Sequence, residues 1–280
     1  MSDPGSGRRP PSGQVLRAPA VAGVFYPSSS GELRRTVEEA LAGAAKRPPQ
    51  NRPGARPVKA VIAPHAGYVY SGSVATSAYA RLAPGRGTVQ RVVVIGPAHR
   101  VALDTVATCS ADAFATPLGK IALDVDGRRA ALSCPGVVVD DRAHAAEHSL
   151  EVHLPFLQVV LGEVALLPLL VGQVPATVVA DVLEAVWGGP ETLVVTSSDL
   201  SHYHDHATAS ALDRETAAAI VACRPDDVGL DRACGVFAVR GLLEAARRRH
   251  LTVEMVDLRN SGDTAGGGER VVGYGAFVLA

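Results

Sequence analysis

Short apolar runs that alternate with segments of helical spacing constrain the fold of this chain more than any other feature. Four of these runs are rich in β-branched residues and show no polar alternation: residues 59–63, 91–95, 164–171 and 192–196. A strand that is apolar on both sides is typical of a parallel sheet that lies between two helix layers. The sequence therefore predicts a central, mainly parallel sheet.

The rest of the pattern completes this fold. Helical spacing occurs in residues 31–41, 73–82, 155–161, 177–187, 207–223 and 235–249. Closing strands are expected at 252–258 and 270–279, and the strand-like segments 105–110 and 120–125 predict an added antiparallel excursion, since no helix separates them. Strands that alternate with helices give an α/β fold, with a mixed central sheet and helices on both faces.

The chain is expected to form a single domain. Its 280 residues suit one α/β domain, which we place at residues 18–280. Residues 1–17 are rich in Ser, Gly, Pro and Arg and lack the apolar run of a secretory signal, so we interpret them as a disordered tail. Segment 46–57 is predicted to be a surface connection, and segment 262–268 a flexible loop.

Composition argues against a nucleic-acid or membrane partner and indicates the redox environment. The net charge is -1, and the basic run 247–249 fits the last turn of a helix, so no nucleic-acid surface is expected. No run reaches the ~18 apolar residues of a membrane helix. The four cysteines form no CxxC pair, which favours a reduced, cytoplasmic protein without disulfides.

Histidines follow three of the predicted strands. His65 lies in APHAGYVYSG, His99 in GPAH and His202 in SSDLSHY, each shortly after the last apolar residue of a strand. One such histidine is commonly structural, but functional residues of open α/β sheets gather where strands end. Because imidazole is a good ligand for Fe, Zn and Cu, the three together predict a mononuclear transition-metal site.

A fourth polar cluster is the segment EHSLEVHLP. It is not the zinc-binding HExxH helix, because the spacing is wrong and Pro155 would disturb a continuous helix. Glu147 and Glu151 are either solvated carboxylates at a helix start or carboxylates that orient metal-binding histidines. The sequence leaves both interpretations open, together with the roles of His148 and His153.

Cys234 precedes the predicted helix 235–249. A helix N-terminus lowers the pKa of a thiol, and the thiolate is the form that binds metal or acts as a nucleophile. The alternative is an inert buried cysteine, the interpretation we give to Cys109, Cys134 and Cys223. For Cys234 both remain open at this point.

Taken in order, these motifs resemble the Memo family, which in prokaryotes is also called AmmeMemoRadiSam system protein B. The resemblance covers nearly the whole chain after about residue 20 and rests on seven segments: AGVFYP, APHAGYVYSG, GPAH, EHSLEVHLPF, SSDLSHY, ACG and RVVGYGAF. Members of this family are similar in fold to the class III, LigB-type, non-heme iron extradiol dioxygenases. The resemblance thus implies a LigB-dioxygenase-like α/β domain with a metal-binding pocket.

The resemblance also implies which residues form the site. The metal ligands of the family fall on His65, His99 and Cys234, and its neighbouring polar pair falls on Asp199 and His202. The dioxygenases themselves use two histidines and a carboxylate, so the thiolate is a difference in ligand chemistry. Similarity of fold therefore does not establish ring cleavage.

Three functions follow as hypotheses. The first is a redox metalloprotein, an oxygen-using oxidoreductase that binds Fe(II), or else Cu or Zn. In it His202, oriented by Asp199, is the general acid and base, because an unperturbed imidazole exchanges protons near neutral pH. The second is a hydrolase in which zinc at the same site activates water.

The third hypothesis is a binding module without catalysis. It would keep the pocket for a small molecule, a peptide or a partner protein, and the name of the family implies partners that include a radical-SAM protein. Tyr68, Tyr70 and Tyr203 could supply contacts, although packing in the core is an equally good interpretation of these tyrosines.

Overall fold

The computed structural model describes residues 13–45 and 57–280. Its strands are β1 (Leu16–Arg17), β2 (Ala60–Ala63), β3 (Arg91–Pro97), β4 (Val106–Thr108), β5 (Ala113–Thr116), β6 (Gly119–Ala122), β7 (Val137–Val139), β8 (Ala165–Val171), β9 (Thr192–Ser197), β10 (His202–His204), β11 (Val253–Asn260) and β12 (Val271–Leu279). Its α-helices are α1 (Ser30–Ala45), α2 (Ser73–Tyr79), α3 (Val125–Leu132), α4 (Asp141–Ala145), α5 (Leu154–Val160), α6 (Ala176–Ala185), α7 (His206–Val221), α8 (Val236–Arg248) and α9 (Ser261–Thr264).

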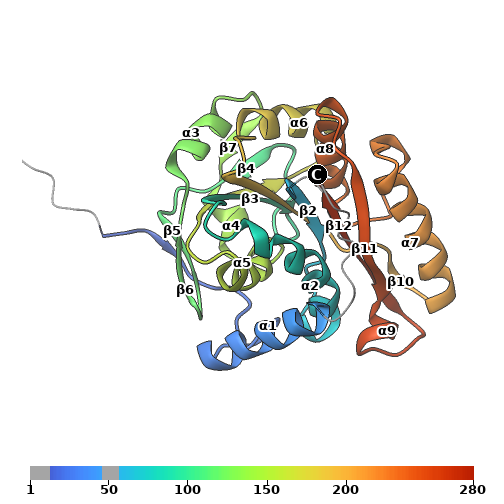
Figure 1. Cartoon of the computed structure of the whole chain (residues 1–280). Coiled ribbons are helices and arrows are strands. Elements are labelled where there is room, and N and C mark those ends of the chain that lie inside the picture. The colour runs from blue at the N-terminus through green and yellow to red at the C-terminus, as the bar shows by residue number, and fades with distance from the viewer. Residues whose placement is uncertain (1–12, 46–56) are drawn as a thin grey trace, which may run out of the picture.

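The predicted α/β fold is confirmed (Figure 1). The main sheet has the strand order β10-β12-β2-β9-β3-β8-β4-β7, and β11 pairs with β12. Strands β2, β9, β3 and β8 are parallel to one another, whereas β12 and β4 add antiparallel pairs on either side of them. The sheet is therefore mixed, with a parallel centre.

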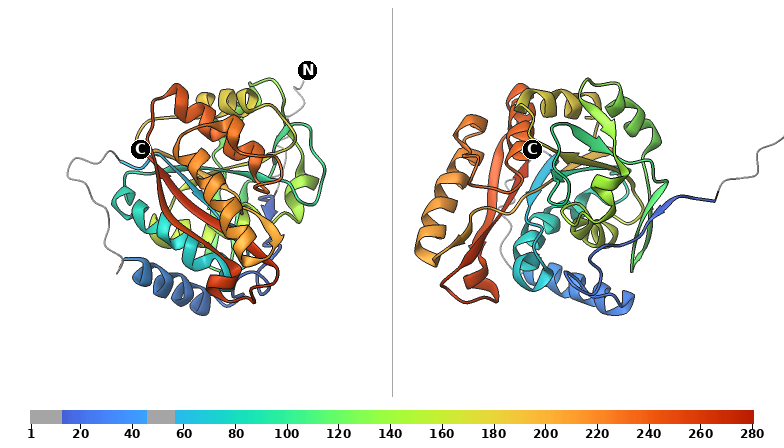
Figure 2. Two further views of the ribbon diagram at one scale, coloured as in Figure 1. Left: turned by 90° about the vertical axis from the view of Figure 1, so that its right-hand side faces the viewer. Right: turned by 180° about the vertical axis from the view of Figure 1, so that it is seen from behind.

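Strand β3 shows why these runs carry no polar alternation. Val92 and Val94 pack into one core with helices α1, α2 and α5, while Val93 and Ile95 pack into a second core with α6, α7 and α8. The helix layers on the two sides of the sheet are visible in Figure 2. Because successive side chains of a strand point to opposite faces, both faces must be apolar.

Several segments differ from expectation. Segments 105–110 and 120–125 do not pair with each other: β4 lies between β8 and β7 in the main sheet, and β6 pairs with β5. The predicted loop 262–268 begins inside the short helix α9, which Asn260 caps. Residues 1–12 of the expected tail and nearly all of connection 46–57 lie outside the described residues.

The folded part also begins before residue 18. Leu16–Arg17 form β1, which pairs in parallel with β5, and Arg17 is buried. Arg17 thus belongs to the domain and not to the expected tail. No helix of the described residues is long and apolar enough to span a bilayer.

The carboxyl ends of β2, β3 and β9 meet at one edge of the sheet, which we call the carboxyl edge. Ala63 at the end of β2 is the register partner of Ser197 at the end of β9. Next to them, a Cβ added at Gly96 of β3 would lie 2.8 Å from the Cβ of Ser197 and 3.1 Å from a methyl carbon of Leu150. Glycine at this position therefore lets the strand ends and the segment around Leu150 pack closely together.

Candidate metal centre

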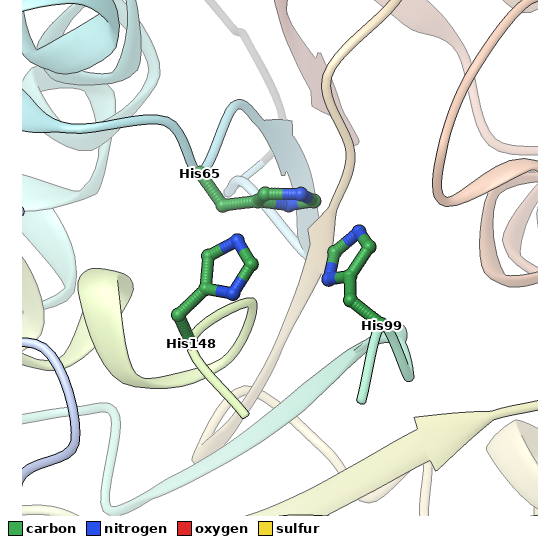
Figure 3. Close-up of side chains that lie close together, drawn as sticks. All are labelled: His65, His99 and His148. Atoms are coloured by element: carbon green, nitrogen blue, oxygen red, sulfur yellow. The ribbon is translucent and has the colours of Figure 1, made fainter. Parts of the chain in front are cut away.

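Three imidazoles gather at the carboxyl edge. His65 follows β2, His99 follows β3, and His148 comes from the segment after α4. One ligand atom from each of the three lies within 4.8 Å of the others, and the ring centroids are 4.7–5.5 Å apart. Figure 3 shows the three side chains lying close together. His65 is buried and the His99 side chain is 30% exposed, so solvent reaches the group from the side of His99.

Hydrogen bonds fix the tautomers of two of these rings. The Ser197 hydroxyl donates to the carbonyl oxygen of Ser149 at 2.6 Å, so its oxygen accepts the Nδ1–H of His65, also at 2.6 Å. The Nδ1–H of His99 donates to the Glu147 carboxylate at 2.9 Å. In a neutral imidazole with Nδ1 protonated, Nε2 keeps its lone pair, which is the arrangement found in histidines that bind metals.

Glu147 organises the segment around the group. Its buried carboxylate accepts the backbone N–H groups of His99, His148 and Ser149 as well as the His99 ring, at 2.5–2.9 Å. Burial alone would raise the pKa of Glu147, but the hydrogen bonds from His148, His99 and Ser149 hold this pKa well below its usual value. Of the two interpretations left open for Glu147, the contacts favour a carboxylate that orients the histidines.

His65 is uncharged in this setting. Burial lowers its pKa well below the usual value, and the neighbouring rings of His99 and His148 lower it further. A neutral imidazole is the form that binds a metal ion.

Cys234 lies directly beside His65. Its Sγ is 3.2 Å from Nε2 of His65 and accepts the backbone N–H of Asp199 at 3.2 Å. A Cβ added at Gly235 would lie 2.4 Å from the carbonyl oxygen of Ser197, so glycine is what lets the start of α8 approach the end of β9. Burial and the Asp199 carboxylate raise the pKa of the Cys234 thiol, which is the opposite direction to the effect of a helix N-terminus on a thiol.

Asp199 and His202 have separate contacts. Asp199 is buried, and its carboxylate accepts the backbone N–H of His65 at 2.7 Å. Asp199 therefore holds the backbone of His65 in place. The Nδ1–H of His202 donates to the carbonyl oxygen of Leu200 at 2.8 Å, and none of the described hydrogen bonds uses its Nε2. Burial raises the pKa of Asp199, and His202 opposes this shift. Among the described contacts, the hydrogen bond to Leu200 orients His202, and no hydrogen bond joins His202 to Asp199, which was expected to orient it.

Sequence reasoning did not select His148. The signal was present in the motif, because Glu147, His148 and Ser149 are consecutive and all three contact the strand ends or the other two histidines. By contrast His153, five residues later, is a core residue. Its Nδ1 is hydrogen-bonded to the Tyr79 hydroxyl at 2.6 Å, and burial lowers its pKa to about 3.

The family model described as "Memo-like protein" matches residues 17–278. The chain belongs to the Memo family. A MEMO1 family protein of Methanopyrus kandleri is 36% identical to this Memo chain over 282 aligned residues, which cover 94% of this chain and 98% of the relative. A MEMO1 family protein of Aquifex aeolicus is 34% identical, with 92% and 97% covered. The resemblance noted from the motifs is thereby confirmed.

A solved structure supports the fold of this Memo-family chain. The crystal structure of an uncharacterized protein of Escherichia coli K12 superposes with a TM-score of 0.50 at 13% identity, covering 78% of this chain and 99% of that one. At this level of identity the likeness shows the fold alone.

Proposed function

We propose that this protein binds one transition-metal ion between His65 and His99 and is a metal-dependent oxidoreductase. The observation that carries the proposal is the meeting of His65, His99 and His148 within 4.8 Å, with Nδ1 of the first two rings already bound to oxygen acceptors. These contacts leave Nε2 of both rings as the nitrogen that would bind a shared ion.

The donor set suits the ions expected from the sequence. Cys234 lies beside His65 and His148 beside His99, so the third ligand is the sulfur or the third imidazole. We propose Cys234, whose thiol would lose its proton to a bound cation although its pKa is raised in the metal-free protein. Two imidazoles and a thiolate match the preferences of Fe(II), Cu and Zn, and we favour Fe(II). The thiolate and the Glu147 carboxylate would together balance the charge of a divalent cation.

The residues around the ion have defined tasks in this proposal. Bound Fe(II) would supply electron transfer and oxygen chemistry. Nε2 of His202, which none of the described hydrogen bonds uses, accepts or returns a proton of the substrate, as imidazoles do in general acid–base catalysis. Asp199 keeps His65 in place because its carboxylate accepts the backbone N–H of His65. The substrate, a small molecule or a peptide, approaches from the exposed side of His99.

Metal analysis of the untagged protein, purified without chelator, tests the proposal. We expect one iron per chain, loss of the ion in His99→Ala, and a weakened, spectroscopically altered site in Cys234→Ser. His148→Ala separates the two candidates for the third ligand. An unchanged site in His148→Ala, with the weakened and altered site in Cys234→Ser, supports the thiolate, and the reverse result supports the imidazole.

Oxygen uptake by the iron-loaded protein tests the reaction class. With catechol, amine and thiol substrates offered in turn, we expect uptake that is abolished in His202→Ala while its iron content is unchanged. Retained zinc with oxygen-independent turnover would instead indicate a hydrolase. Binding of a partner that survives removal of every proposed ligand would indicate a binding module.

A further inference from the structure

A buried ion pair joins the beginning of the described chain to the segment that carries Glu147 and His148. Arg17 of β1 pairs with Glu151, and their side chains are 7% and 0% exposed. Neither residue touches the three histidines of the candidate metal centre. The two side chains instead contact the backbone of residues 144–147 and of residues 20–21.

The Arg17 side chain holds segment 144–151 through the backbone of that segment. Its Nε donates to the carbonyl oxygen of His144 at 3.1 Å, and a terminal nitrogen donates to the carbonyl oxygen of Glu147 at 2.5 Å. The guanidinium also lies 5.0 Å from the ring centroid of Phe114, the register partner of Arg17 on β5. Arg17 therefore fixes the position of the Glu147 backbone, and with it the start of the Glu147 side chain.

Glu151 holds the opposite segment, residues 20–26. Its carboxylate accepts the backbone N–H groups of Ala20 and Val21 at 2.7 and 3.0 Å, and the hydroxyl of Tyr26 at 2.5 Å. Between these anchors, the ring of Phe25 packs against the His148 imidazole with centroids 4.8 Å apart.

The same segment continues to the loop after His65. The backbone N–H of Tyr68 donates to the carbonyl oxygen of Phe25 at 2.8 Å. The pair thus connects segment 20–26, the loop that begins at His65 and the segment that carries His148, which come from distant parts of the sequence.

We propose that Arg17 and Glu151 are positioning residues of the metal centre. The pair fixes the Glu147 carboxylate and the His148 ring, and through Glu147 it sets the orientation of the His99 imidazole. This inference rests on the proposed metal site. Removal of one partner leaves an uncompensated buried charge and releases the carbonyl oxygens of the segment, so the segment should move although every ligand is still present.

Titration of the metal-free protein with Co(II), followed by visible absorption, tests the inference. We expect Arg17→Met to weaken Co(II) binding by about ten- to a hundredfold, the range typical when a partner that orients a metal ligand is lost. We also expect a changed d–d absorption band, which a purely destabilising substitution would leave unaltered, and partial recovery of both in Arg17→Lys.

The matched control is Arg91→Met. Arg91 pairs with Asp124 through side chains that are 30% and 8% exposed, at the other end of the strand that leads to His99. Loss of this pair should lower stability while the affinity and the absorption spectrum stay as in the wild type. If Arg17→Met does not fold, Glu151→Gln, which keeps the size of the side chain, carries the same expectations.

Amide hydrogen exchange of the metal-free proteins separates this inference from the proposed function. Residues 144–151 should exchange faster in Arg17→Met than in Arg91→Met. A wild-type protein that binds no Co(II) would refute the metal site, and the exchange result would then decide alone whether the pair fixes the segment. Wild-type affinity, spectrum and exchange in Arg17→Met would overturn the inference.

Discussion

Both ends of the central strands carry polar groups, but the groups are arranged differently at the two ends. At the amino ends, Lys59 donates to the carbonyl oxygens of Trp187, Gly189 and Thr192 at 2.6–2.8 Å. At the carboxyl edge, the rings of His65, His99 and His148 lie close together, and those of His65 and His99 use only Nδ1 for hydrogen bonds to oxygen acceptors. One end pairs donors with acceptors, whereas the other brings like groups together.

This difference shows which end is built for binding. Donors matched to acceptors stabilise the fold and need no ligand. Burial and then the neighbouring imidazoles lower the pKa of His65, because convergent imidazoles disfavour one another's charged form. Such clusters persist where a ligand compensates for them. The following substitutions test this contrast.

The largest effect is expected for His65→Ala. It should weaken metal binding by about a thousandfold or more, beyond the ten- to hundredfold loss typical of residues that only orient a ligand. His153→Gln is the matched control, because His153 is equally buried but hydrogen-bonded to Tyr79 in the core. Isothermal titration of both variants measures the difference; similar losses in the two would remove the distinction between site and core.

Glu147→Gln should have the next largest effect. The charge that orients His99 is lost while the size of the side chain is kept, so metal affinity should fall by about ten- to a hundredfold. Glu191→Gln is its counterpart at the amino ends, where the carboxylate accepts the backbone N–H of Gly189. Unchanged affinity in Glu147→Gln, or an equal loss in Glu191→Gln, would contradict the account.

Acid should destabilise the metal-free protein partly through His153. Its pKa is lowered from 6.5 to about 3 in the folded state, so the unfolded chain binds the proton more tightly and stability is lost as the pH falls below 6.5. Between pH 7 and pH 5 the loss from this one residue is about 2 kcal/mol. Urea unfolding at both pH values should show this dependence reduced in His153→Gln; an identical dependence would mean that His153 is not buried as a neutral ring.

Lys59→Met should have the smallest effect. Three carbonyl oxygens lose a donor, but water replaces it in part because Lys59 is only half-buried, so the free energy of unfolding should fall by about 1 kcal/mol. Metal affinity should equal that of the wild type. A change in metal affinity would show that the two ends of the sheet are coupled.

Periodicity predicted the parts of the fold that local chemistry decides. Residues 91–95 could be identified as a buried central strand because burial on both faces leaves no place for polar side chains. Short strands such as β5 and β7, with 4 and 3 residues, carry too little pattern to be recognised. Their pairing with β1 and β4 depends on contacts across the fold.

The candidate site likewise contains residues that the sequence predicts and residues that it does not. His65 and His99 could be predicted because strand ends place them at a common edge. His148 could not, since its place depends on Arg17, more than a hundred residues earlier in the chain, and on the carboxylate of Glu147. Glu147 and Glu151 look alike in the sequence, yet one contacts the histidines and the other an arginine.

Anomalous diffraction from an iron-loaded crystal, recorded at the iron absorption edge, tests the central claim most directly. The account predicts one strong peak per chain, within bonding distance of Nε2 of His65 and Nε2 of His99. Iron bound at any other position, or the absence of a peak between these two rings in crystals saturated with iron, would contradict it.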